Sequence, residues 1–132
     1  KYVAAYTASG LTPDGSCTYN LAKHVGLLRA KELLLTNRVL TAEEAREWGM
    51  VNKVVEAERL RVEAMALART FAVGPTRAFG GTKQLLNTAY SEPMESQLER
   101  ETLSIAGSLE TRDGKHGLDA FLNKTKPEYI GE

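Results

Sequence analysis

The sequence predicts a mostly α-helical chain with one or two short strands, at its start and near residues 51–55. The opening run, residues 1–7, is apolar and strand-like, and such a run normally lies inside a sheet with neighbours on both sides. From residue 18 onward, apolar residues recur at the spacing of amphipathic helices. No later segment clearly supplies neighbours for the first strand. We therefore expect either a processed or truncated chain or a sheet formed by sequence outside residues 1–132.

The first 35 residues are expected to lead from the strand through a loop into two helices. Residues 9–16 are dense in residues that favour turns. Beyond them, apolar residues recur at helical spacing up to residue 35, with an interruption at Gly26. Because glycine weakens a helix interior, we predict a short helix before Gly26 and a longer one after it.

A capping box marks the start of the next helix. In this pattern the Thr41 hydroxyl and the Glu44 carboxylate each satisfy a free amide of the first helical turn. Gly49 supplies a left-handed stop, so the pattern predicts a two-turn helix from Ala42 to Trp48. Residues 50–55 are expected to form a short strand or an extended segment.

The second half of the chain is expected to be helical almost throughout. Three apolar stripes at helical spacing predict three helices, around residues 60–71, 79–89 and 94–109. Pro75 opens the second of these helices, at a position where its missing amide costs nothing. A fourth helix should end at Lys126 and Pro127, because proline cannot continue a helix.

Composition restricts the class of protein. A chain of 132 residues suits a single domain, and 42% hydrophobic with 26% charged residues is typical of folded globular proteins. Seventeen basic residues balance seventeen acidic ones, so no global field would gather nucleic acid or an anionic membrane. The lone Cys17 excludes an internal disulfide and a zinc-type cluster. No apolar run approaches the ~20 residues of a membrane span. We expect a cytoplasmic protein that binds neither nucleic acid nor a membrane.

Several stretches of the chain resemble the crotonase family in order and in spacing. They are Gly10–Leu21, Ala30–Thr36, Leu40–Val51 and, near the end, Gly114–Leu122. The resemblance implies the α/β crotonase (ClpP/crotonase-like) fold, with Gly114–Leu122 forming a glycine-rich turn and the helix after it. It also implies an enzyme that acts on acyl groups carried as coenzyme A thioesters, with no separate cofactor and no metal.

Crotonase proteins are about twice as long, and the resemblance begins in the middle of the family pattern. It implies that residues 1–55 form the C-terminal part of the crotonase core, with the active-site loop. Residues 56–132 would form a helical oligomerisation region, and a homotrimer or hexamer is expected. In the family, backbone amides of N-terminal strands form most of the oxyanion hole, which stabilises the enolate. The chain alone is therefore expected to be inactive.

The resemblance points to Asp14 as the catalytic residue. Hydratases of the family commonly place a carboxylate seven residues before the loop proline, where this chain has Tyr6. A phenol cannot replace a carboxylate as a base at neutral pH. Another branch, which includes enoyl-CoA isomerases, carries an acid directly after that proline, and the matching residue is Asp14. An isomerase is therefore favoured. The alternatives are a hydratase that uses acids outside this chain and a noncatalytic helical assembly module.

Four more residues are candidates for substrate binding. Tyr6, Leu11 and Tyr19 are expected to contribute an apolar wall that would make Asp14 a stronger base. Lys124 resembles a family lysine of the last helix that reaches the adenosine and phosphate end of coenzyme A. Each role has a structural alternative. Asp14 would also suit a turn or a helix cap, and Lys124 would also suit bulk solvent.

Overall fold

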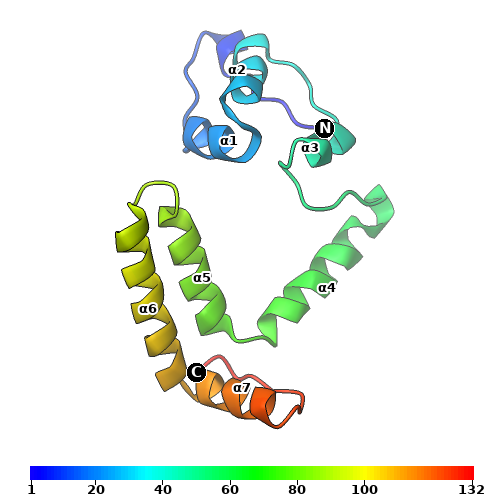
Figure 1. The fold of residues 1–132 in the computed structure, drawn as a ribbon. Coiled ribbons are helices and arrows are strands. Elements are labelled where there is room, and N and C mark those ends of the chain that lie inside the picture. The colour runs from blue at the N-terminus through cyan, green and yellow to red at the C-terminus, as the bar shows by residue number, and fades with distance from the viewer. The chain divides into compact units, whose positions relative to one another are not determined.

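The computed structural model describes residues 1–132, which form two compact units, Lys1–Glu58 and Arg59–Glu132. Helices dominate both units, as predicted (Figure 1). None of the helices combines the length and the apolar character that a membrane span requires. The division after Glu58 lies close to the predicted one between residues 55 and 56. The roles assigned to these two parts stay predictions.

The first unit is built from short helices. They are the 3₁₀ turn η1 (Thr7–Ser9) and the helices α1 (Cys17–Val25), α2 (Leu27–Thr36) and α3 (Ala42–Glu47), and the 3₁₀ turn η2 (Ala57–Arg59) spans the boundary to the second unit. Helices α1 and α2 pack against each other. The predicted break between them is confirmed at Gly26, whose φ of 82° lies in a region that favours glycine.

The predicted capping box is present at the start of α3. The Glu44 amide donates to the Thr41 hydroxyl oxygen at 3.1 Å, and the Thr41 amide donates to the Glu44 carboxylate at 2.9 Å. Gly49 follows the helix with a φ of 75°, in agreement with the predicted left-handed stop. Local sequence therefore fixes both ends of this short helix.

A small core holds the first unit together. Leu33, Leu40 and Ala45 are buried, and partly buried side chains that include Leu21 and Trp48 pack against them. Leu40 is fully buried, and burial of a leucine side chain contributes about 1.5–3 kcal/mol. The core therefore joins α2, α3 and the segment between them.

The short strands expected at the start and near residues 51–55 do not form. Tyr2 makes one antiparallel bridge with Leu40, in which each amide donates to the other residue's carbonyl at 2.8 Å. Residues 51–55 have no regular secondary structure. A strand needs a neighbouring backbone along its length, and within this chain the opening run meets such a partner only at Leu40.

The second unit contains the four predicted helices. They are α4 (Leu60–Ala72), α5 (Thr76–Thr88), α6 (Met94–Glu110) and α7 (Arg112–Leu122). Figure 1 shows α5 and α6 side by side, with α7 turning away at the end of α6. Phe71 of α4 contacts Phe79 of α5 in an edge-to-face arrangement, with the two ring centroids 5.7 Å apart.

The predicted glycine-rich turn before the last helix is wrong. Gly114 and Gly117 lie inside α7, which already begins at Arg112. The Thr111 hydroxyl caps the helix by accepting from the Gly114 amide at 2.9 Å. A Cβ atom at Gly114 would lie 1.9 Å from the Ser108 carbonyl oxygen. This glycine therefore allows the close approach of two helices rather than a turn.

Helix α7 ends earlier than predicted. Its last residue is Leu122, and Lys124 follows in the left-handed region with a φ of 55°. The amides of Lys124 and Thr125 donate to the carbonyls of Phe121 and Ala120, so these bonds close the helix before Pro127 is reached. Lys124 therefore lies outside the last helix, contrary to the prediction.

Candidate functional site

Tyr6 and Asp14 are brought together by the loop between η1 and α1. The Asp14 carboxylate, as hydrogen-bond partner and as a nearby negative charge, raises the pKa of the Tyr6 phenol. Desolvation and the neighbouring Cys17 act in the same direction.

The loop takes this shape because several of its residues adopt positive φ angles. Gly10, Gly15 and Ser16 have φ angles of 71°, 57° and 64°, which glycine adopts freely and serine rarely. The Tyr6 carbonyl accepts from the Ser9 and Leu11 amides, both at 3.0 Å. The turn at Gly10 thus lies between Tyr6 and Asp14, and Gly15 and Ser16 lead from Asp14 into α1.

Tyr6 also lines an open, mainly apolar hollow of about 450 Å³ in the first unit. Its apolar lining consists of Val3, Ala4, Leu21, Leu33 and Met50, and its polar or titratable lining of Lys1, Tyr2, Tyr6 and Cys17. Sequence reasoning missed Cys17 and Met50 as lining residues.

The remaining candidate residues are not gathered around Asp14. Leu11 and Tyr19 are 62% and 55% exposed. The Tyr19 hydroxyl accepts from Lys23 Nζ at 2.6 Å on the surface of α1. Neither side chain lines the hollow beside Tyr6. Their contribution to an apolar wall, and that of Lys124 to coenzyme A binding, stay predictions.

Of the two structural alternatives for Asp14, the structure shows the turn, which Asp14 opens, but not the helix cap. Ser16 is the N-cap residue of α1, and no side-chain cap hydrogen bond is formed there. The main-chain carbonyl of Asp14 accepts from the Cys17 amide at 2.9 Å. The carboxylate itself is exposed and paired with Tyr6, so it is available for chemistry.

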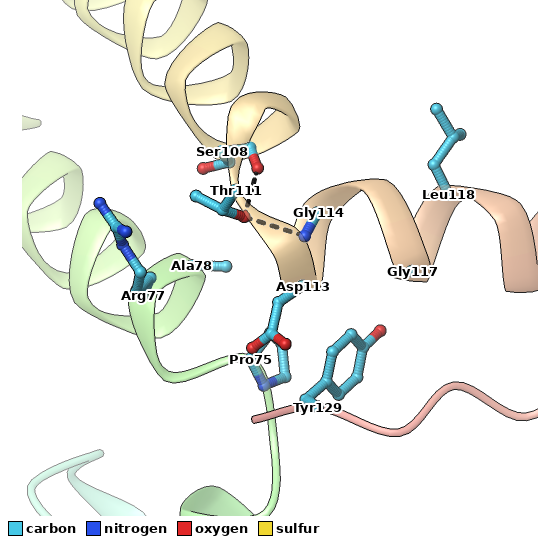
Figure 2. Close-up of a pocket in the computed structure, with 10 residues that line it drawn as sticks. All are labelled: Pro75, Arg77, Ala78, Ser108, Thr111, Asp113, Gly114, Gly117, Leu118 and Tyr129. Atoms are coloured by element: carbon cyan, nitrogen blue, oxygen red, sulfur yellow. Dashed lines mark hydrogen bonds between the residues drawn. The ribbon is translucent and has the colours of Figure 1, made fainter. Parts of the chain in front are cut away.

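A second cavity, of about 190 Å³, lies in the second unit between the start of α5 and the corner of α6 and α7 (Figure 2). Asp113 lines it and is only 4% exposed. Its carboxylate accepts from the Ile130 amide at 2.9 Å and from the Gly131 amide at 2.8 Å. Asp113 thus fastens the C-terminal segment to α7, which is a structural role.

No group of three or more His, Cys, Asp and Glu side chains is arranged to hold a metal ion. Cys17 and His24, at opposite ends of α1, form no contact with each other, and His24 Nδ1 lies 2.7 Å from the Asn20 carbonyl oxygen.

Comparison with known proteins identifies the family. A family model described as Enoyl-CoA hydratase/isomerase matches residues 1–132. The chain is 39% identical to 1,2-epoxyphenylacetyl-CoA isomerase of Escherichia coli (strain K12), over 100% of this chain and 50% of that protein. It is 36% identical to 4-chlorobenzoyl coenzyme A dehalogenase-1 of Arthrobacter sp, over 82% of this chain and 39% of that protein.

Solved structures agree with the sequence comparison. The enoyl-CoA hydratase from Bacillus anthracis superposes with a TM-score of 0.88 at 31% identity, covering 98% of this chain and 50% of that chain. The chain thus spans about half the length of the relatives it matches. It belongs to the enoyl-CoA hydratase/isomerase family, whose crotonase fold the sequence resemblance had led us to expect.

Proposed function

We propose that the protein carrying this chain is an acyl-CoA isomerase in which Asp14 moves a proton between two carbons of the acyl chain. The observation that carries the proposal is an exposed carboxylate, free of any cap role, near the phenol of Tyr6, whose side chain in turn lines an apolar hollow. Similarity to an isomerase over the whole chain supports it.

The reaction needs a single base. For a 3-enoyl-CoA, Asp14 takes a proton from C2, and the electrons of that C–H bond delocalise onto the thioester oxygen as a dienolate. The protonated Asp14 then returns the proton to C4. The double bond moves from C3–C4 to C2–C3, and the base is restored. The carboxylate must lie within about 3 Å of each carbon in turn.

The enolate oxygen needs hydrogen-bond donors placed before the reaction begins. We assign these donors to sequence outside residues 1–132, since the relatives are about twice as long as this chain. It follows from the proposal that residues 1–132 alone should not catalyse the reaction. Substrate binding through the coenzyme A portion would likewise be shared with that sequence.

The test follows double-bond conjugation by absorbance with 3-hexenoyl-CoA and the complete protein. The proposal predicts turnover that collapses in Asp14→Asn while the variant keeps its native circular dichroism. The sequence's second candidate, a hydratase, predicts instead that 2-hexenoyl-CoA gains water at a rate that Asp14→Asn does not change. A complete protein inert toward both substrates would contradict both and favour an assembly module.

We further propose that the protein is a cytoplasmic homotrimer or hexamer that associates through its helical second unit. Large apolar side chains of α6 stand exposed, among them Leu98, Ile105 and Leu109, which recur at helical spacing on one side of the helix. Light scattering of the complete protein should give three or six times the subunit mass. A monomer would refute this part of the proposal.

A further inference from the structure

The cavity of the second unit lies where α5, α6, α7 and the C-terminal segment meet (Figure 2). Its volume is about 190 Å³, and an apolar cavity of about 150 Å³ is large enough to bind benzene. We propose that this cavity is a binding site for an uncharged aromatic molecule with a single ring. The site belongs to the second unit alone, and the inference does not depend on the proposed isomerase function.

Polar groups along the inner wall of the cavity already have hydrogen-bond partners within the protein. The two carboxylate oxygens of Asp113 each accept from one main-chain amide, at 2.9 and 2.8 Å. The Thr111 hydroxyl donates to the Ser108 carbonyl at 2.7 Å and accepts from the Gly114 amide at 2.9 Å. The Ser108 hydroxyl donates to the Ser104 carbonyl at 2.8 Å. Because a buried water needs about two to four polar partners, this wall suits an apolar guest better than water.

The remaining lining favours an aromatic guest. Pro75 and Ala78 contribute apolar surface from the start of α5, and Tyr129 contributes its ring from the C-terminal segment. The Tyr129 ring lies directly against α7, since a Cβ atom at Gly117 would come within 3.2 Å of ring atom Cε1 and 3.1 Å of the hydroxyl oxygen. Two aromatic rings attract each other in edge-to-face or offset-stacked arrangements. Tyr129 therefore gives an aromatic ring an advantage over a saturated ring of the same size.

The charged residues of the lining do not offer a partner to a charged guest. Asp113 is 4% exposed, and both its oxygens accept amides, so an apolar guest displaces little water from it. The Arg77 side chain points away from Asp113 and Tyr129 in Figure 2. A charged guest would lose its hydration in the cavity without gaining an ion pair there, which is costly. The site therefore selects an uncharged molecule.

The wall that Tyr129 forms is fixed on both sides along the chain. Before it, the Glu128 amide donates to His116 Nε2 at 3.2 Å. After it, the Ile130 and Gly131 amides donate to the carboxylate of α7 described above. The cavity is thus formed without a guest, and a preformed site binds with little cost for ordering the protein.

The test titrates benzene into the complete protein labelled with ¹³C-tyrosine. A guest ring in the cavity should shift the ring signals of Tyr129 in a saturable manner, and Tyr129→Phe assigns these signals by their loss. Asp14→Asn should leave the titration unchanged, so this inference and the proposed function fail separately. Tyr129 signals that stay in place up to the solubility limit of benzene would overturn the inference.

A matched pair of substitutions locates the guest. Ala78→Leu places a larger side chain in the cavity and should weaken benzene binding by about tenfold or more, because a filled cavity accepts a guest only with strain. Ala106→Leu makes the same change at an exposed position of α6 that does not line the cavity, and it should bind benzene like the unmodified protein. Equal binding by the two variants would overturn the assigned site.

A comparison of guests needs no variant and so stays informative if Ala78→Leu fails to fold. Cyclohexane resembles benzene in size but has no aromatic ring, and it should bind about twofold to tenfold more weakly, the contribution of an aromatic pair. Equal affinity for both guests would contradict the aromatic preference. Tighter binding of benzoate than of benzene would show that Arg77 makes this a site for anions, and it would overturn the inference of an uncharged guest.

Discussion

The two units hold a carboxylate in opposite ways. In the first, Asp14 is exposed, and its partner is one phenol. In the second, Asp113 is buried and accepts two main-chain amides from the C-terminal segment. The buried carboxylate has its acceptor sites committed to the fold, whereas the exposed one retains sites for a substrate proton. The structural Asp113 and the candidate base Asp14 are the same residue type, and they differ in how many of their oxygen atoms already accept hydrogen bonds from the protein.

The largest expected effect is on the activity of a variant at Asp14, and it tests the difference between the two carboxylates. Asp14→Asn should lower kcat for isomerisation by about 10²–10⁴, the range that a general base contributes. Its free energy of unfolding should change by less than about 0.5 kcal/mol, as for surface substitutions generally. Steady-state kinetics and urea denaturation of the same preparation measure both. A marked loss of stability would assign Asp14 to the fold and break the contrast.

Asp113→Asn should show the reverse pattern. The amide group replaces one acceptor oxygen by a donor, so one of the Ile130 and Gly131 amides loses its partner. We expect a loss of about 1–3 kcal/mol in unfolding free energy, the cost of an unsatisfied buried group. Hydrogen exchange at Ile130 and Gly131 should also accelerate. Asp119→Asn, an exposed position in the same helix, is the matched control, and equal losses in both variants would contradict the assigned role.

A smaller effect is expected at the cap of α3. Thr41→Ala removes the hydroxyl that accepts from the Glu44 amide, and loss of such a cap costs about 1 kcal/mol. Thr41→Ser keeps the hydroxyl and should retain most of the stability. Urea unfolding followed through Trp48 fluorescence reports on this unit, because Trp48 packs against its core. Equal stability of the Ala and Ser variants would exclude the cap as a contributor.

The smallest expected effect concerns the pH dependence of the same cap. Hydrogen bonds from the Thr41 amide and hydroxyl, together with Arg38, lower the pKa of Glu44 from the usual 4.5. A lowered pKa stabilises the fold above the unfolded value, and this stabilisation is lost as pH falls through the folded value. Glu44→Gln should therefore be less stable than the unmodified protein at pH 7, with the difference shrinking on acidification. Denaturation at pH 7 and pH 3 measures it, and a difference independent of pH would contradict the linkage.

The helices could be predicted from sequence because their signals are local. The capping box of α3, the break at Gly26 and the apolar stripes of the second unit each lie within one or two helical turns. The strands could not, because a strand depends on a partner backbone elsewhere. The opening run meets only Leu40 within this chain, whatever its own propensity.

The candidate site was only partly predictable. Asp14 could be named from the proline before it and the family pattern. Its proximity to Tyr6, eight residues earlier, depends on the conformation of the whole loop between them, which includes a positive φ at Gly10, and the sequence does not specify that conformation. Asp113 was missed because its partners are main-chain amides 17 and 18 residues away, which carry no residue signature.

The tight corner at Gly114 sets a limit on sequence variation that experiment can exploit. Any side chain there would overlap the Ser108 carbonyl, and alanine, the smallest replacement, already meets backbone that cannot rotate away. In a saturation library selected for soluble expression, position 114 should survive as glycine alone. Gly107, in α6, has nothing within 4 Å of an added Cβ. It should therefore tolerate substitution, and it serves as the internal control for how strict the selection is.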